Sequence, residues 1–165
     1  MVHIWGSIMK DQINPDYYKN YTIEVTDAIE SWGLSFVQGN IIKYIVRSGK
    51  KTTDPQQDLE KALKQIAKIC PLVVCTKAHE GVTAIQDSNR VDVGVNRISA
   101  VDTTGAGDQF AAGFLYGLAS GYDLETNCKM GNIAAGEVIG HIGPRPKVSV
   151  KKLFVQSSLI SDLTD

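Results

Sequence analysis

The sequence has little cysteine, no excess of charge of either sign and no long apolar run. Its three cysteines lie at spacings that match no metal-binding or disulfide pattern, which indicates reduced thiols in a cytoplasmic protein. Lys and Arg number 17 against 18 for Asp and Glu, so the charge predicts neither a nucleic-acid nor a membrane partner. No apolar run approaches the roughly 18 residues that a membrane span needs, and residues 1–12 lack the apolar core of a signal peptide.

The first part of the chain predicts a small helical segment. Apolar residues recur at helical spacing in three stretches, which predicts helices over 23–32, 36–48 and 55–69. Gly33 and Gly49 are expected to end the first two helices, and Asp54 to cap the third. Residues 1–12 are expected to be a loose lead-in, followed by a turn at Asn14-Pro15-Asp16.

The remainder predicts an α/β arrangement. The run from Pro71 to Thr76 is continuously apolar and β-branched, which is typical of a buried parallel strand. Two more strands are expected over 82–86 and 91–95, joined by a turn at 87–89. Helical patterns then cover 108–120 and 124–141, and residues 148–155 fit either a strand or a short helix.

A glycine-rich loop joins the strands to the first of these later helices. Gly105, Ala106 and Gly107 carry almost no side-chain bulk, so the backbone can turn tightly and approach a ligand. Their amides lie at a helix N-terminus, where unpaired N–H groups and the helix dipole favour an anion. The loop therefore predicts a site for phosphate, or for the charge that develops during phosphoryl transfer.

Asp108 follows the loop directly, although a carboxylate beside a phosphate is electrostatically unfavourable. A general base that takes the proton of an attacking hydroxyl would explain its presence. The alternative is that Asp108 only caps the helix, because Asp is a favoured N-cap residue.

The run Asp102–Asp108, followed at fixed spacing by Ala112-Gly113-Phe114-Leu115, resembles the C-terminal signature of the ribokinase-like (PfkB) family of sugar and nucleoside kinases. From about residue 59 the chain is similar to the C-terminal third of such a kinase, most of all the bacterial adenosine kinase branch. The resemblance implies the C-terminal part of a three-layer α/β/α fold. It also implies ATP and Mg²⁺ as cofactors, and K⁺ as a further possibility.

The same resemblance assigns roles to individual residues. It implies that Asp108 is the catalytic base and that the amides of Gly105, Ala106 and Gly107 form the anion hole for the ATP phosphates. Asp102 and Thr104 fall near the family's monovalent-cation loop. No site for another metal is expected.

The nucleotide itself is expected to lie near three further positions. The strand ending at Thr76 leads into a turn that has two glycines in the family, of which Gly81 is kept and the first is replaced by Ala78. Asn132, on the last long helix, falls where the family lines the adenine pocket. The alternative for Asn132 is an ordinary polar residue on a helix surface.

Residues 13–66 resemble a different family, a small phage-type helical domain of unknown function that includes a phage nucleotide kinase. Domains are therefore expected at 1–58 and 59–165, joined through a helix that fits both families. One interpretation makes the basic cluster Lys43, Arg47, Lys50 and Lys51 a solvated helix end, and another makes it a phosphate contact.

Three functions are consistent with these patterns. The first is an ATP-dependent phosphotransferase acting on a hydroxyl of a sugar or an adenosine-like nucleoside, incomplete as an isolated chain because ribokinase-type kinases are about twice as long. The second is a nucleotide-binding remnant without catalysis. The third is a phage-type accessory protein whose helical domain carries the function. The expected partners are a small molecule and either a second copy or the missing kinase half.

Overall fold

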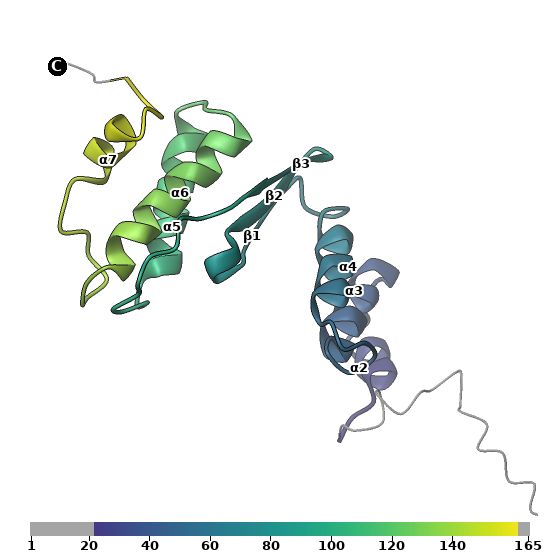
Figure 1. Cartoon of the computed structure of the whole chain (residues 1–165). Helices are drawn as coiled ribbons and strands as arrows, with labels where there is room; N and C mark the ends of the chain where they lie inside the picture. The colour runs from purple at the N-terminus through teal and green to yellow at the C-terminus, as the bar shows by residue number, and fades with distance from the viewer. Residues whose placement is uncertain (1–21, 162–165) are drawn as a thin grey trace, which may run out of the picture. The chain divides into compact units, whose positions relative to one another are not determined.

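The computed structural model describes residues 22–161, which belong to two compact units that meet between Cys70 and Pro71 (Figure 1). The expected lead-in and the turn at Asn14-Pro15-Asp16 lie outside the described residues. Among residues 22–161, every helix is too short or too polar to cross a bilayer.

The first unit contains the three predicted helices, α2 (Val25–Ser31), α3 (Phe36–Arg47) and α4 (Gln56–Ile66). Ser35 caps α3, because its hydroxyl accepts from the amide of Gln38 while the Gln38 side chain accepts from the amide of Ser35. The N-cap residue of α4 is Pro55 and not Asp54 as predicted, although Asp54 Oδ1 accepts from the amide of Gln56 at 2.9 Å. The α4 helix ends three residues earlier than expected.

A buried ion pair joins α3 to α4. The guanidinium of Arg47 donates from Nε and Nη2 to the two carboxylate oxygens of Asp58, at 3.1 and 2.9 Å, and Lys61 Nζ lies 3.0 Å from Oδ1. Burial alone would raise the pKa of Asp58, but the hydrogen bonds from Arg47 and Lys61 outweigh it and hold that pKa below its usual range. Arg47 is 9% exposed. Arg47 is therefore neither solvated nor available to a phosphate. Both interpretations of the basic cluster were wrong for this residue.

The second unit begins with a three-stranded sheet of β1 (Leu72–Thr76), β2 (Val82–Gln86) and β3 (Asn89–Val93), in that order. A short 3-10 helix, η1 (Ala78–Glu80), joins β1 to β2. Asp87 and Ser88, with φ of +47° and +72°, form the two-residue turn between β2 and β3. Then follow α5 (Ala106–Ala119), α6 (Leu124–Ile139) and α7 (Val150–Gln156). Residues 148–155 are thus mainly helical.

The strand β1 corrects one prediction, because it pairs antiparallel with β2 and is only half-buried. The connection between the two strands covers five residues, 77–81, whereas a parallel pair needs a crossover of a dozen or more. Within residues 22–161, β1 has no strand on its other side.

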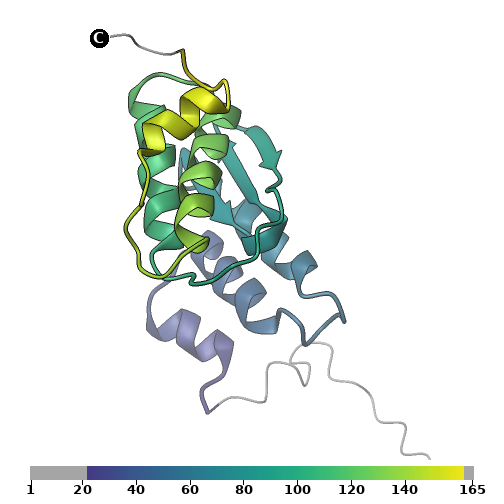
Figure 2. The same cartoon turned by 60° about the vertical axis from the view of Figure 1, so that its left-hand side comes forward.

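The core of the second unit lies between the sheet and α5 and α6, which run side by side (Figures 1 and 2). Phe110 and Phe114 of α5 pack with Val82 and Ala84 of β2 and with Leu124 and Cys128 of α6. Burial raises the pKa of the Cys128 thiol to about 11. The α/β fold class, preceded by a helical segment, is confirmed.

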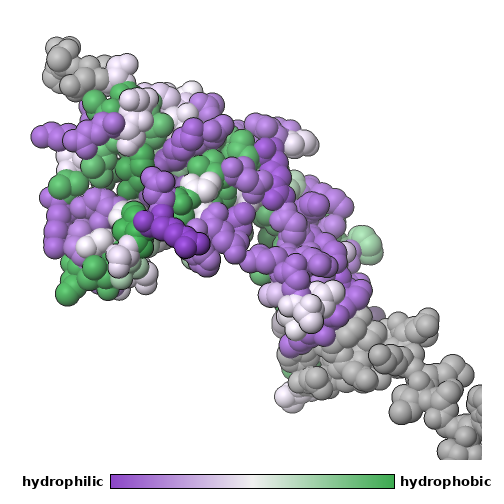
Figure 3. Space-filling view, in the orientation of Figure 1, coloured by the Kyte–Doolittle hydropathy of each residue, from purple (hydrophilic) through white to green (hydrophobic). Residues whose placement is uncertain are grey.

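A second apolar cluster joins α6 to α7 and the residues that follow it, through Met130, Phe154 and Ile160. On the face drawn in Figure 3, hydrophobic residues in green gather on the second unit, whereas the described part of the first unit is mainly hydrophilic. Within residues 22–70 the buried hydrophobic residues are Val25, Ala62 and Leu63, so the Arg47–Asp58 ion pair lies in a small apolar core.

We expect Asp58→Asn to destabilise the first unit by about 3–5 kcal/mol, because Arg47 would stay buried without its anionic partner. Asp54→Asn is the matched control, since Asn caps helices as well as Asp. Thermal unfolding followed by helical circular dichroism measures the difference, and equal midpoints for the two variants would contradict the expectation. Since the pKa of Asp58 is lowered in the folded state, its contribution is present above about pH 4 and is lost on acidification.

Candidate functional site

The N-terminus of α5 is built on a glycine that no other residue can replace without strain. Gly105 is the N-cap residue, with φ of +78°, a left-handed conformation that favours glycine. A Cβ at this position would also lie 2.5 Å from Cβ of Pro144. Gln109, one turn into the helix, donates from Nε2 to the Pro144 carbonyl at 3.3 Å. The loop after α6 therefore closes directly against the glycine-rich loop.

Asp102 joins the same two loops by hydrogen bonds. Its Oδ1 accepts from the amide of Thr104 at 2.9 Å and its Oδ2 from the amide of Gly143 at 3.0 Å. The hydrogen bond from Gly143, followed by those from Thr104, lowers the pKa of Asp102 to about 2. The carboxylate is thus ionised over the physiological range and orders the backbone on both sides of the helix start.

This geometry leaves backbone donors at the start of α5. The amide of Ala106 donates to the carbonyl of Thr103 at 3.2 Å. The amides of Gly105, Gly107 and Asp108 have no acceptor among residues 22–161, since helical pairing in α5 begins with Gln109 N to Gly105 O at 2.9 Å. Donors at a helix N-terminus form the anion-binding arrangement that the sequence indicated.

Asp108 is the third residue of α5 and its carboxylate makes no capping hydrogen bond. The alternative in which Asp108 serves only as a helix cap is therefore wrong, because Gly105 occupies the cap position. The side chain is exposed, and it does not line the cavity described next. It is available to a group that approaches the outer side of the first helical turn.

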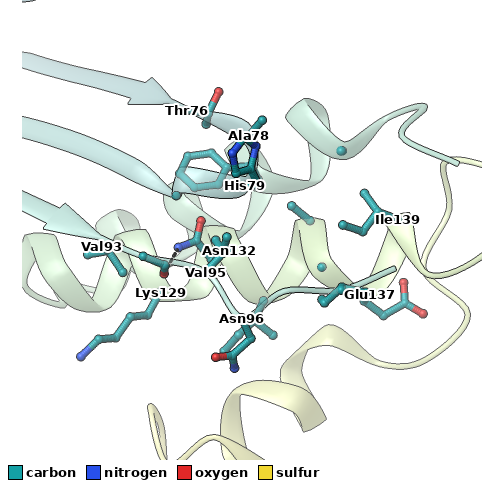
Figure 4. A pocket seen from close by; sticks show the side chains of 18 of the residues that line it. Thr76, Ala78, His79, Val93, Val95, Asn96, Lys129, Asn132, Glu137 and Ile139 are labelled. Carbon is teal, nitrogen blue, oxygen red and sulfur yellow. Dashed lines mark hydrogen bonds between the residues drawn. The ribbon is translucent and has the colours of Figure 1, made fainter. Parts of the chain in front are cut away.

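A cavity of about 1570 Å³ opens between the end of the β1–β2 hairpin, residues 93–100, the start of α5 and one side of α6 (Figure 4). Of the residues singled out in the sequence, six line it: Thr76, Ala78, Gly81, Ala106, Gly107 and Asn132. It is larger than the roughly 300–1000 Å³ of typical ligand pockets, so it has room for a nucleotide without matching one in size. Gly105 and Asp102 lie in the adjoining loop rather than in the lining.

In the turn from β1 to β2, this chain keeps one glycine of the family pattern and replaces another. Gly81 has φ of +96°, and a Cβ there would collide with the carbonyl oxygen of Val93, so only glycine fits. Ala78, where the family pattern has glycine, adopts a left-handed φ of +49°. That conformation costs a residue with a Cβ about 1–2 kcal/mol, so Ala78 is a strained position in this turn.

Asn132 is half-buried and donates from Nδ2 to the carbonyl of Gly94 at 3.2 Å (Figure 4). The bond ties α6 to the segment after β3 on one side of the cavity. Four further lining residues have ionisable side chains and belonged to no motif in the sequence: His79, Arg97, Lys129 and Glu137. Glu137 accepts from the amide of Lys147 at 2.9 Å and lies 3.3 Å from Nε2 of His141.

The profile of the pfkB family carbohydrate kinases matches residues 46–151, which is more than half of the chain. The chain belongs to the PfkB family. The described residues of this PfkB chain bring together no group of three or more His, Cys, Asp or Glu side chains that could hold a metal ion.

Individual relatives agree with the family match. The chain is 37% identical over 93 residues to adenosine kinase from Saccharomyces cerevisiae, covering 53% of this chain and 27% of that protein. A probable sugar kinase from Rhizobium etli (39% identity, TM-score 0.59) and adenosine kinase from Sinorhizobium meliloti (42%, 0.59) match 74% and 73% of this chain in structure. In both cases the chain spans 34% of the solved protein.

A second profile, of a protein family of unknown function (DUF3310), matches residues 13–66. The two matches overlap over residues 46–66, which include all of α4. The compact units divide at Cys70, whereas the sequence placed the family boundary at 58/59. That boundary stays a prediction.

We expect Asp102→Asn to loosen the glycine-rich loop, because the amide can accept at one oxygen only and its NH₂ group would face one of the two backbone donors. Amide hydrogen exchange at Thr104 and Gly143 should accelerate. Asp87→Asn, in the β2–β3 turn, removes the same charge elsewhere and is the control. Unchanged protection at both amides in Asp102→Asn would show that Asp102 does not hold the loops.

Proposed function

We propose that the chain is part of an ATP-dependent phosphotransferase that phosphorylates a hydroxyl of a sugar or an adenosine-like nucleoside. The observation that carries the proposal is the start of α5, where free amides adjoin a cavity with room for a nucleotide and a carboxylate without a capping role. Family membership and the sugar and adenosine kinases among the relatives support it.

The cavity would hold ATP with its phosphates toward the glycine-rich loop. The amides of Gly105 and Gly107 would donate to phosphate oxygens, and the positive end of the α5 dipole would add to the attraction. Asn132 and the turn at Gly81 would face the base and ribose, with Thr76 at the strand end beside them. Family resemblance adds Ala106 to the loop, although its amide donates to Thr103 in this conformation.

Asp108 would act as the general base. It accepts the proton of the acceptor hydroxyl as that oxygen forms a bond to the γ-phosphorus of ATP, and the bond from phosphorus to the bridging oxygen breaks to release ADP. The free donors at the start of α5 would stabilise the charge on the transferred group. The exposure of Asp108 fits this role, because the acceptor must reach it from outside the nucleotide cavity.

Mg²⁺ would be held by the ATP phosphates together with water and one or two carboxylates. Asp102 and Thr104 remain the candidates for a K⁺ loop, as the family resemblance implies. The acceptor pocket and the choice between sugar and nucleoside belong to the portion of a PfkB kinase that this chain does not match. A cytoplasmic location completes the proposal.

A non-catalytic nucleotide-binding protein is the second candidate, and one observation favours it. The chain spans only 27–34% of the relatives it matches, while phosphoryl transfer needs both substrates held in line. Equilibrium ATP binding without turnover in any assembly would favour this candidate. A role carried by the helical unit alone is the third, and it predicts no ATP binding at all.

Gly107→Val should weaken ATP binding by about 1–3 kcal/mol, the cost of stranding hydrogen bonds to a charged group. A Cβ at Gly107 meets no atom within 4 Å, so the fold should tolerate the substitution. Ala119→Val, at the exposed far end of α5, controls for a β-branched residue in the same helix. Calorimetric titration with ATP makes the comparison, and equal affinities would rule out the loop as a phosphate site.

Asp108→Asn should lower phosphoryl transfer by about 10²–10⁴-fold while ATP affinity is unchanged or slightly improved. Asn has the same shape but cannot take the acceptor's proton near neutral pH. Turnover is measured with adenosine, ribose and fructose in turn, with Asp87→Asn as the charge-matched control. A wild-type rate in Asp108→Asn would show that another group is the base.

A further inference from the structure

The carboxylate of Glu137 contacts both ends of the loop that follows α6. Its Oε1 accepts from the amide of Lys147 at 2.9 Å, and both of its oxygens lie 3.3 Å from Nε2 of His141. The Glu137 side chain is only 9% exposed. Figure 4 shows it at the opposite end of the cavity from Lys129. One nearly buried anion thus joins residues 141 and 147 to the last part of α6.

The surroundings of His141 favour a hydrogen on each of its ring nitrogens. Nε2 faces the Glu137 carboxylate, and Nδ1 lies 3.2 Å from the carbonyl oxygen of Ile142. An ionised carboxylate and a carbonyl can only accept a hydrogen bond. A neutral ring has a single N–H, so it would leave one nitrogen lone pair facing an oxygen. The His141 side chain, which is 13% exposed, is therefore satisfied on both sides as the imidazolium cation.

The same cation lies near the second carboxylate that holds this loop. The hydrogen bond from the amide of Gly143 is the main cause of the low pKa of Asp102, followed by those from Thr104, and the charge of His141 lowers that pKa further. Two carboxylates that hold one short loop repel each other. A cation near both of them offsets that repulsion, so His141 supports the contacts that Asp102 and Glu137 make.

The loop held in this way carries the proline against which the glycine-rich loop packs. A Cβ at Gly105 would lie 2.5 Å from Cβ of Pro144, and Gln109 donates to the Pro144 carbonyl at 3.3 Å. Pro144 lies between the two backbone amides that donate to Asp102 and Glu137. Its position therefore depends on contacts on both sides, and the Glu137 side of the loop is held by an ion pair.

We propose that Glu137 and the His141 cation are positioning residues of the anion site at the start of α5. Their ion pair holds residues 141–147 so that Pro144 keeps Gly105 in place, and the free amides beside Gly105 stay directed toward a phosphate. Both side chains act through the loop and neither touches the anion. That the anion is a phosphate of ATP rests on the proposed function, whereas the positioning of the helix start does not.

A second ion pair of the same spacing on α6 provides a matched control. Nζ of Lys129 lies 2.7 Å from Oε1 of Glu125, again four residues apart, but these side chains are 45% and 56% exposed. Solvated pairs of this kind contribute little to stability. Glu125 is in the first turn of α6, at the other end of the helix from the loop. We therefore expect Glu125→Gln to leave the loop and the start of α5 unchanged.

Amide hydrogen exchange separates a positioning role from a purely local one. The amide of Gly143 reports on the loop, and the amide of Gln109 reports on the start of α5, because it donates to the carbonyl of Gly105 at 2.9 Å. We expect both amides to exchange about fivefold faster or more in Glu137→Gln and in His141→Gln, within the usual coupling between contacting side chains. Since the pair acts as one unit, the double variant should exchange no faster than the faster single variant.

Two exchange results would overturn the proposal. One is an unchanged rate at Gln109 in both single variants, which would confine the pair to its own loop. The other is a double variant whose acceleration is the product of the two single ones, since Glu137 and His141 would then act independently. Circular dichroism verifies that the variants are folded. If His141→Gln does not fold, Glu137→Gln carries the test together with His141→Arg, which keeps the cation and should leave the rate at Gln109 unchanged.

ATP binding tests the same role by the direction of its change. Loss of a negative charge would by itself strengthen the binding of an anion, whereas loss of a positioning residue weakens it. We expect calorimetric titration to show about fivefold weaker ATP binding in Glu137→Gln than in Asp87→Asn, because a less preorganised site binds more weakly. Equal or tighter binding in Glu137→Gln would overturn the proposal. If the wild type binds no ATP while exchange at Gln109 depends on the pair, the positioning role stands and the proposed function fails.

Discussion

The close approach of Gly105 to Pro144 determines where α5 begins, and the candidate site depends on that point. A Cβ at Gly105 would lie 2.5 Å from the proline ring, so the two loops can touch only because one of them has no side chain. Asp102 adds two hydrogen bonds across the same junction. Together they hold the free amides of Gly105 and Gly107 beside the cavity and turn Asp108 outward.

Much of this site could be predicted from the sequence, because its signal is local. A run of three small residues before an apolar helical pattern predicts a tight turn, exposed amides and a helix start, whatever the rest of the chain does. The distinction between cap and base at Asp108 could not be made that way. Whether Asp108 is the cap residue depends on where the helix begins, and the structure has Gly105, close to Pro144, in the cap position.

The predictions that failed concern which residues pair with one another. A continuous apolar strand is typical of a parallel sheet buried on both faces, and β1 has that composition although its described partner is antiparallel. The short connection of residues 77–81 indicated an antiparallel pair. The prediction of a parallel strand followed the composition of β1 instead. Arg47 was misread for a related reason, since its partner Asp58 lies eleven residues away on another helix. Charge clusters in a sequence do not reveal which members are buried.

The overlap of the two family matches on α4 has a physical basis in the helix itself. Asp58, Ala62 and Leu63 are buried, and Asp58 joins this face to α3 through Arg47. Leu59 on another side of the helix is 44% exposed, and Ile69 just after the helix is 52% exposed. One side of α4 is buried against α3, and other apolar residues of the helix are exposed. Such a helix fits the pattern of a helical domain and also that of a helix before a sheet. The overlap of the two matches therefore includes a helix with one side buried against α3 and with other apolar residues exposed.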